Sequence, residues 1–185
     1  LPAALSETEA LTALRDLAAR NNPRRAMIGL GYHGTVTPSV IRRNVLEDPA
    51  WYTAYTPYQP EISQGRLEAL INFQTMVADL AGLDIANASM LDEGTAVVEA
   101  MLLARRASKS ASSVFVVDAD LLPQSKALLR HRAHATGIEL VELPLAQTAP
   151  ADLPDSFGVI AQLPGASGLA WDARGIFTAS AEMGG

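Results

Sequence analysis

The second half of the chain alternates short apolar runs with segments of helical period. The short runs predict buried strands, and the segments between them carry apolar residues at the spacing of amphipathic helices. The expected strands are 84–90, 113–117, 138–143 and 157–163, and the expected helices are 93–106 and 123–136. This alternation is typical of an α/β domain with a mostly parallel sheet and helices on both of its faces. The proline-rich segment 144–156 is expected to be a surface loop.

The first part of the chain predicts helices. Ser6 and Glu9 form the S-x-x-E pattern of a capping box, which predicts a helix over 6–20. Two further helices are expected, over 37–46 with Thr37 as N-cap and over 64–80 with Ser63 as N-cap. The pattern therefore divides the chain into an N-terminal helical arm, 1–83, and part of a large α/β domain, 84–185.

Composition narrows the function classes. With 185 residues and 49% hydrophobic content, the chain is long and apolar enough to form a core. A net charge of −6 argues against a nucleic-acid binder, and no apolar run approaches the roughly 20 residues of a membrane span. The absence of cysteine excludes disulfides, thiolate metal sites and cysteine nucleophiles. No segment resembles a signal peptide. Given the negative net charge and the short apolar runs, neither nucleic acid nor a membrane is an expected partner.

An aromatic stretch, Trp51–Gly65, interrupts the predicted helices. Trp51, Tyr52, Tyr55 and Tyr58 fall within eight residues, among prolines that oppose a helix. Such a loop offers rigid, amphipathic contact surface. Two interpretations follow from the residues alone: the aromatic rings fill the edge of their own core, or they form the wall of a binding site.

The segments 28–83, from IGLGYHGTVTPS to VADLAGL, and 87–106, NASMLDEGTAVVEAMLLARR, resemble the glycine cleavage system P-protein family, the glycine decarboxylases. The resemblance implies the fold of the large aminotransferase class (fold type I), with pyridoxal phosphate as cofactor. It also implies that the full enzyme decarboxylates glycine and passes the aminomethyl group to the lipoyl arm of the H-protein. In this family the Schiff-base lysine lies in a C-terminal half or a separate subunit, and the N-terminal half is its degenerate partner.

The resemblance also implies the partners of the protein, and the Ala- and Arg-rich, Lys-poor composition favours a bacterial compartment. The chain is expected to be an N-terminal piece of a longer protein, partnered by the C-terminal half or a partner subunit in a homodimer or heterotetramer. Its arm and long helix are expected to lie at the subunit interface. The compartment is expected to be the bacterial cytoplasm, or the mitochondrial matrix in a eukaryote.

The aromatic stretch carries the main candidates for the wall of a substrate and cofactor pocket. These are Tyr55, Tyr58, Gln59 and Glu61, whose hydroxyl, amide and carboxylate groups suit contacts to glycine or the cofactor. Tyr32 and His33 in the glycine-rich segment 27–35, with the neighbouring 35–38, are secondary candidates. The G-x-G-x-x-G fingerprint is absent there, so nucleotide binding is not expected.

The segment around Gly94 and Thr95 has the layout of a phosphate site at a helix N-terminus. Asp92 and Glu93 oppose it, because two carboxylates repel a phosphate. Carboxylates at this position suit the helix dipole. We therefore interpret the segment as a degenerate phosphate site whose acidic residues cap the helix.

The chain contains two lysines, Lys109 and Lys126, and neither directly follows a predicted buried strand. Both are expected to be solvated surface charges, so no catalytic residue is assigned to this chain. His131 and His134 lie three residues apart on one predicted helix, but flanking arginines oppose a cation, so no metal site is expected. The turn 165–168 could contact a ligand or be a plain connection.

A second hypothesis is that the chain is a non-catalytic assembly half, used for dimerisation and H-protein docking. It needs only the apolar bodies of the aromatic residues, whereas a site role needs the hydroxyls and Glu61. A different aminotransferase-class enzyme is a third hypothesis, which the length of the resemblance opposes.

Overall fold

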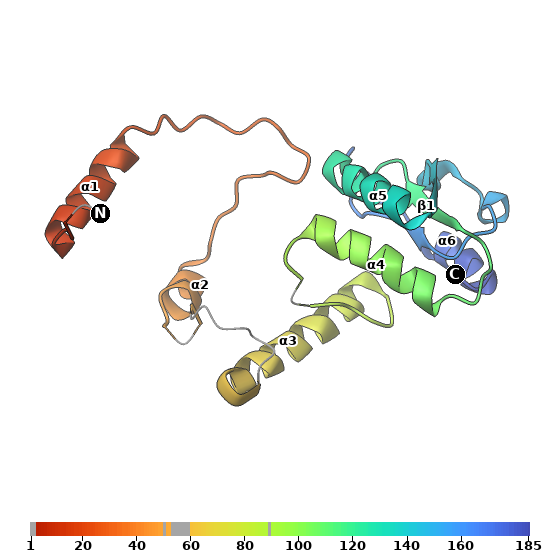
Figure 1. Cartoon of the computed structure of the whole chain (residues 1–185), viewed down its shortest axis with the longest axis horizontal. Helices are drawn as coiled ribbons and strands as arrows, with labels where there is room; N and C mark the ends of the chain where they lie inside the picture. Colours follow the sequence, from red (N-terminus) through yellow and green to blue (C-terminus); the bar gives the residue numbers. More distant parts are fainter. Residues whose placement is uncertain (1–2, 50, 53–59, 89) are drawn as a thin grey trace. The chain divides into compact units, whose positions relative to one another are not determined.

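The computed structural model describes residues 3–49, 51–52, 60–88 and 90–185, and for 60–65 it describes the backbone alone. The chain divides into two compact units, Leu1–Val36 and Thr37–Gly185. The boundary predicted at 83/84 stays a prediction. Figure 1 labels helices α1 to α6 and strand β1.

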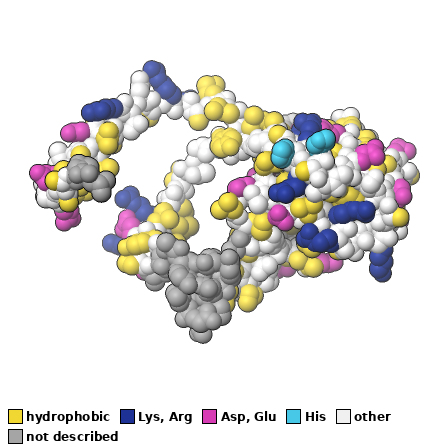
Figure 2. All heavy atoms as spheres, viewed as in Figure 1, with side chains coloured by type: hydrophobic (Ala, Val, Ile, Leu, Met, Phe, Trp, Pro, Cys, Tyr) yellow, Lys and Arg dark blue, Asp and Glu magenta, His cyan; other side chains and the backbone are white. Residues whose placement is uncertain are grey.

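The first unit contains helix α1, Glu7–Ala19. The predicted capping box is confirmed: the Glu9 N–H donates to the Ser6 hydroxyl oxygen over 3.4 Å, and the Ser6 N–H donates to Glu9 Oε2 over 2.8 Å. The Ser6 hydroxyl also donates to Glu9 Oε2 over 2.6 Å. These bonds favour the charged carboxylate and lower the pKa of Glu9. No residue of α1 is buried within the described structure. Figure 2 shows hydrophobic and acidic side chains mixed on its surface.

The second unit begins with short helices that differ in detail from the prediction. Helix α2, Ser39–Ile41, continues as a π-helical turn, η1, Arg42–Leu46, and its N-cap is Pro38 rather than Thr37. Helix α3, Pro60–Ala81, starts before the predicted cap Ser63, so part of the predicted aromatic loop is helical. A proline is well tolerated in the first turn, because its missing N–H has no partner there in any case. Gly82, with φ 67°, follows α3 as expected.

A three-stranded parallel sheet forms the centre of the second unit. Its order is β2 (Glu139–Leu143), β1 (Val114–Asp118), β3 (Val159–Ile160). Val116 of β1 is aligned with Val141 of β2 on one side and with Val159 of β3 on the other. The predicted parallel α/β arrangement is therefore confirmed.

Helices cover both faces of this sheet. Helices α4 (Glu93–Ala107) and α5 (Pro123–Thr136) bury Met101 and Leu129 against Phe115 and Val117 of β1. Helix α6 (Arg174–Glu182) buries Ile176 against Val116 on the opposite face. Neighbouring β1 residues point to opposite faces, which is why this strand is apolar throughout.

Two expectations for this region are wrong, and a third holds for only part of its length. The described residues of 84–90 form no strand, and of 157–163 only Val159–Ile160 pairs. The segment 144–156 contains two 3-10 turns, η2 (Leu145–Gln147) and η3 (Pro150–Asp152), and it buries Leu145 and Ser156, so it belongs partly to the core. Helix α6 was not predicted, and its N-cap residue, Ala173, makes no side-chain capping bond at the start of the helix. There Arg174 donates to Asp172 and holds the pKa of that carboxyl at about 2.

Candidate functional site

The carboxyl edge of the sheet is where ligands bind in parallel α/β folds, at the point where connections from neighbouring strands diverge. In this chain that point lies between β1 and β3. The connection from β1 leads through α5 to β2 on one side, while β3 lies on the other side. The loops that would enclose a ligand are therefore 119–122 and 161–170.

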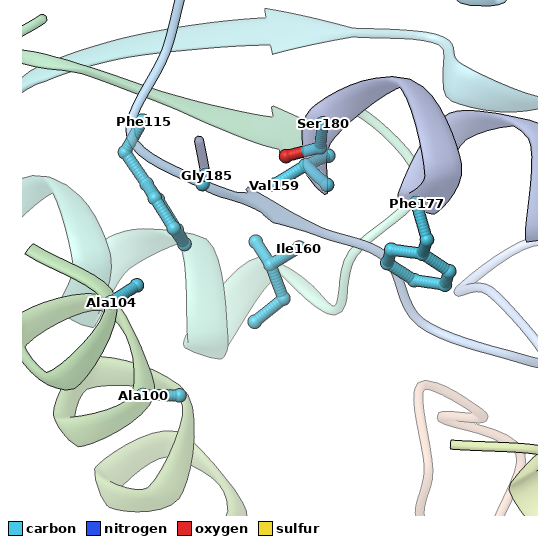
Figure 3. A pocket seen from close by; sticks show the side chains of 9 residues that line it. Ala100, Ala104, Phe115, Val159, Ile160, Phe177, Ser180 and Gly185 are labelled. Carbon is cyan, nitrogen blue, oxygen red and sulfur yellow. The ribbon is translucent and has the colours of Figure 1, made fainter. Parts of the chain in front are cut away.

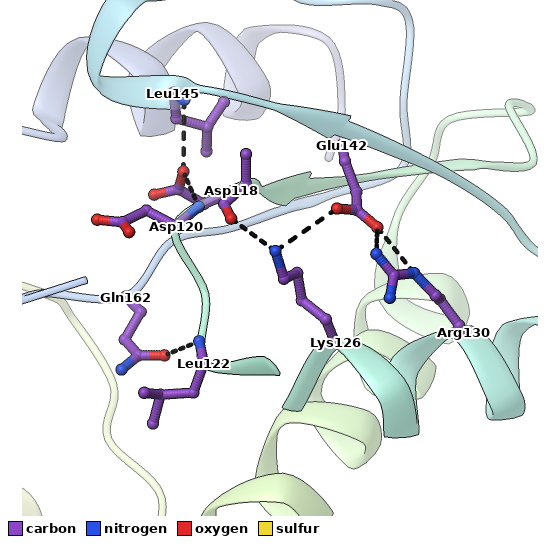
Figure 4. Close-up of polar contacts among 9 residues, drawn as sticks. Asp118, Asp120, Leu122, Lys126, Arg130, Glu142, Leu145 and Gln162 are labelled. Carbon is purple, nitrogen blue, oxygen red and sulfur yellow. Dashed lines mark hydrogen bonds and ion pairs between the residues drawn. The ribbon is translucent and has the colours of Figure 1, made fainter. Parts of the chain in front are cut away.

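Hydrogen bonds between these two loops close the crevice. The Asp120 carboxylate accepts from the Ser167 N–H over 3.0 Å and from the Ser167 hydroxyl over 2.6 Å. The Asp120 backbone carbonyl accepts from the Ala166 N–H over 2.7 Å. The Leu122 N–H donates to Gln162 Oε1 over 3.0 Å (Figure 4). The polar groups of the two loops thus form hydrogen bonds with one another at the position where a ligand would bind.

Gly165 shows how tightly the crevice is closed. A Cβ at this position would lie 1.9 Å from Asp120 Oδ2 and 2.5 Å from Asp120 Cγ. The turn 165–168 is therefore packed closely against Asp120 at Gly165, and contact of this turn with a ligand stays a prediction.

Asp118 lies directly beneath this closed crevice. It is 1% exposed, and its Oδ1 accepts from the N–H groups of Asp120 and Leu145 over 3.1 and 3.4 Å (Figure 4). Among the described residues its Oδ2 has no hydrogen-bond partner. An open cleft of about 300 Å³ borders Asp118, Asp120, Gln147 and Ser167. The carboxylates of Asp118 and Asp120 at this cleft disfavour an anionic ligand such as a phosphate.

Lys126 is not the solvated charge that the sequence predicts. Its Nζ donates to the Ala119 carbonyl over 2.7 Å and lies 3.7 Å from Glu142 Oε2, and its side chain is 18% exposed. Arg130 pairs with the same carboxylate (Figure 4). Lys126 therefore links α5 to the ends of β1 and β2. Helical spacing places Lys126 and Arg130 on one face, but only the parallel register brings Glu142 to them.

The start of α4 confirms the predicted capping role of Asp92. Its Oδ1 accepts from the Thr95 N–H over 2.8 Å, and its Oδ2 accepts from the Thr95 hydroxyl over 3.0 Å. Gly94 is buried, and a Cβ there would lie 2.5 Å from Leu128 Cδ1. Gly94 therefore serves close packing between α4 and α5. The degenerate phosphate layout of Gly94 and Thr95 itself stays a prediction.

Replacing Asp92 with alanine should lower the free energy of unfolding by about 1 kcal/mol, because two donors at the helix start lose their acceptor. Urea unfolding followed by far-ultraviolet circular dichroism measures this change. Glu99→Ala, at an exposed position in the middle of the same helix, is the control and should change stability by less than about 0.5 kcal/mol. Equal effects of the two substitutions would contradict the capping role.

Pyridoxal phosphate does not fit the described residues at this edge. The helix start that would hold its phosphate is already capped by a carboxylate. The crevice beside β1 is closed, and Lys126 is held by Ala119 and Glu142. Lys109 is exposed, and its backbone N–H donates to the Gly184 carbonyl over 3.2 Å.

The remaining predicted residues are placed only in part. Tyr55, Tyr58 and Gln59 lie outside the described residues, and Glu61 lies in α3 with its side chain outside the description. Tyr32 and His33 are exposed in the first unit, where Tyr32 N–H donates to Gly29 O in a turn with positive φ at residues 29–31. The assignment of these six residues to a pocket wall stays a prediction.

The described residues contain no group of three or more His, Cys, Asp and Glu side chains that could hold a metal ion. His131 and His134 are both exposed on α5. No helix in the described part is long and apolar enough to cross a membrane.

The family model of the glycine cleavage system P-protein matches residues 1–183. The chain belongs to this family. The crystal structure of a glycine decarboxylase (P-protein) of the glycine cleavage system, in inhibitor-bound form, is similar to it at 39% sequence identity with a TM-score of 0.80. The match covers 100% of this chain and 42% of that chain, so the P-protein piece spans less than half of its solved relative. The fold is accordingly part of the large domain of fold type I.

Proposed function

We propose that this chain is the N-terminal part of a glycine decarboxylase, glycine dehydrogenase (decarboxylating). The full enzyme would decarboxylate glycine with pyridoxal phosphate and pass the aminomethyl group to the lipoyl arm of the H-protein. The family match over residues 1–183 carries this proposal. The similarity to a solved glycine decarboxylase over the whole chain supports it.

Within that enzyme, this piece would supply structure around the active site rather than the group that holds the cofactor. The closed crevice, the carboxylate cap of α4 and the engagement of Lys126 support this division of roles. The Schiff-base lysine would come from a C-terminal half or a partner subunit of a homodimer or heterotetramer. The enzyme would work in the bacterial cytoplasm, or in the mitochondrial matrix of a eukaryote.

The wall residues can be tested in the complete enzyme. Replacing Tyr55 and Tyr58 with phenylalanine should slow glycine–bicarbonate exchange by about tenfold or more, because each hydroxyl would contact the glycine carboxylate or the cofactor. Glu61→Gln should also slow it. Tyr52→Phe is the matched control, since Tyr52 is 63% exposed in the same stretch, and should leave the rate unchanged. Unchanged exchange in the Tyr55 and Tyr58 variants would refute the wall assignment.

The exposed apolar positions of the first unit favour a second candidate, a purely structural half that dimerises and docks the H-protein. Leu11, Leu14 and Leu17 of α1 are 44%, 61% and 55% exposed, which is typical of a helix that packs on a partner. Under this candidate the tyrosine hydroxyls are dispensable, whereas charged substitutions on α1 weaken assembly. The exchange assay and the assembly state measured by light scattering together separate the two candidates.

A further inference from the structure

Two clefts of the second unit have similar volumes but different chemistry. The cleft beside β3 has a volume of about 310 Å³, and none of the described residues that line it is charged. Figure 3 shows Ala104, Ile160 and Phe177 around this cleft. The cleft at the carboxyl end of β1 has a volume of about 300 Å³ and is lined by both Asp118 and Asp120. We call this second one the acidic cleft.

Asp118 brings a buried oxygen atom without a partner to the acidic cleft. The residue is 1% exposed, and its Oδ1 accepts from two backbone N–H groups. Its Oδ2 is buried as well, and no described residue donates to it. A buried carboxylate oxygen without a partner is rare and costly, because the charge has lost its hydration without a replacement. A ligand at Asp118 Oδ2 would remove this cost.

The negative charge of the acidic cleft is not balanced by the neighbouring lysine. Lys126 Nζ donates to the Ala119 carbonyl and lies 3.7 Å from Glu142 Oε2. Figure 4 shows the carboxylates of Asp118 and Asp120 on the side of the strand end that faces away from Lys126. Among the described residues, neither aspartate forms a salt bridge. A cation bound in this cleft would be attracted by both carboxylates.

The burial of Asp118 Oδ2 favours a metal ion over an ammonium group or a water molecule. N–H and O–H donors lie about 2.7–3.2 Å from their acceptor, whereas Mg²⁺ and Ca²⁺ lie about 2.0–2.6 Å from a carboxylate oxygen. A metal ion can therefore approach a buried oxygen more closely than a donor group can. Gln147 and Ser167 also line the cleft, and their side-chain oxygens are of the type that these ions bind.

We propose that the acidic cleft binds one divalent metal ion of the Mg²⁺ or Ca²⁺ class through Asp118 Oδ2 and the Asp120 carboxylate. Each Asp120 oxygen accepts one hydrogen bond from Ser167, and a carboxylate oxygen has a second lone pair for the ion. Water molecules and the Gln147 amide oxygen would complete the coordination. Such ions retain several water molecules, so a third carboxylate is not required. This site is independent of the chemistry proposed above.

Calorimetric titration of the complete enzyme, freed of metal with a chelator, tests the site. One Mg²⁺ or Ca²⁺ per copy of this chain should bind with a Kd of about 0.1 to 1 mM, because two carboxylates make a weak site. Asp118→Asn and Asp120→Asn should each weaken this binding by at least about tenfold. Asp152→Asn, at an exposed position of η3, is the matched control and should leave the Kd unchanged. No saturable binding, or the same Kd in all four proteins, would overturn the proposal.

Thermal unfolding gives a second test. At about 10 mM, Mg²⁺ or Ca²⁺ should raise the Tm of the parent enzyme and of Asp152→Asn by about 2 °C or more, because the ion binds only the folded protein. The Tm of Asp118→Asn should rise by less than half as much. An equal rise in Asp118→Asn, or an equal rise with choline chloride at matched ionic strength, would contradict a specific site. Binding of methylammonium with the same affinity would assign the cleft to an amine and also overturn the proposal.

Discussion

Leu129→Ala should lower the free energy of unfolding by about 3 kcal/mol. Leu129 is 0% exposed and packs with Met101, Phe115 and Val117 between α5 and the sheet. Truncating the Leu129 side chain removes buried apolar atoms and leaves a cavity between α5 and the three-stranded sheet. Chemical unfolding of the purified chain, followed by circular dichroism, measures the change.

The neighbouring leucine is a matched control for this prediction. Leu128 lies on the same helix but is 45% exposed, so Leu128→Ala should cost about 1 kcal/mol or less. Equal losses from the two substitutions would mean that Leu129 is not packed between α5 and the sheet.

Gly165→Ala should lower the free energy of unfolding by about 2 to 3 kcal/mol and loosen the carboxyl edge of the sheet. The new Cβ would lie 1.9 Å from Asp120 Oδ2, so the carboxylate must move away from Ser167 and lose two hydrogen bonds. Thermal or urea unfolding measures the loss.

A double-mutant cycle identifies the cause of that loss. In the background of Asp120→Ala, the Gly165→Ala substitution should cost much less, because the clashing carboxylate is gone. Gly34→Ala is the control for the change of residue type, since nothing lies within 4 Å of a Cβ at Gly34. Fully additive effects of the Asp120 and Gly165 substitutions would mean that the two residues do not close the crevice together.

Local signals in the sequence identify most helices correctly. Ser6 and Glu9 mark the start of α1, and Pro123 and Gly137 mark the two ends of α5. Gly137 takes a φ of 69°, which explains why the helix stops at that residue. These elements depend on contacts within a few residues, so a single sequence contains the information that places them.

The sequence-based predictions that fail concern features that are determined by contacts between residues far apart in the sequence. β3 is only Val159–Ile160, because pairing with β1 and not apolar character alone sets its length. Leu145 looks like a loop residue but is 1% exposed against Val116 and Ile176. Both outcomes depend on the register of strands that lie far apart in sequence.

The candidate site shows the same division. Asp92 could be identified as a cap because its partner, Thr95, is three residues away. The pairing of Asp120 with Ser167 spans 47 residues, and no local pattern announces it. The acidic end of a buried strand, 118–120, is the signal that could have drawn attention to this edge.

Reconstitution of the complete enzyme shows whether this chain is a necessary part of a glycine decarboxylase that does not itself hold the cofactor. Glycine–bicarbonate exchange should be measured with the remainder of the enzyme, H-protein and pyridoxal phosphate, with and without this chain. We predict exchange only when the remainder and this chain are both present, and no exchange or cofactor binding by this chain alone. Full exchange by the remainder without this chain would mean that the chain is dispensable for the reaction. Cofactor binding and exchange by this chain alone would mean that the chain itself holds the catalytic site.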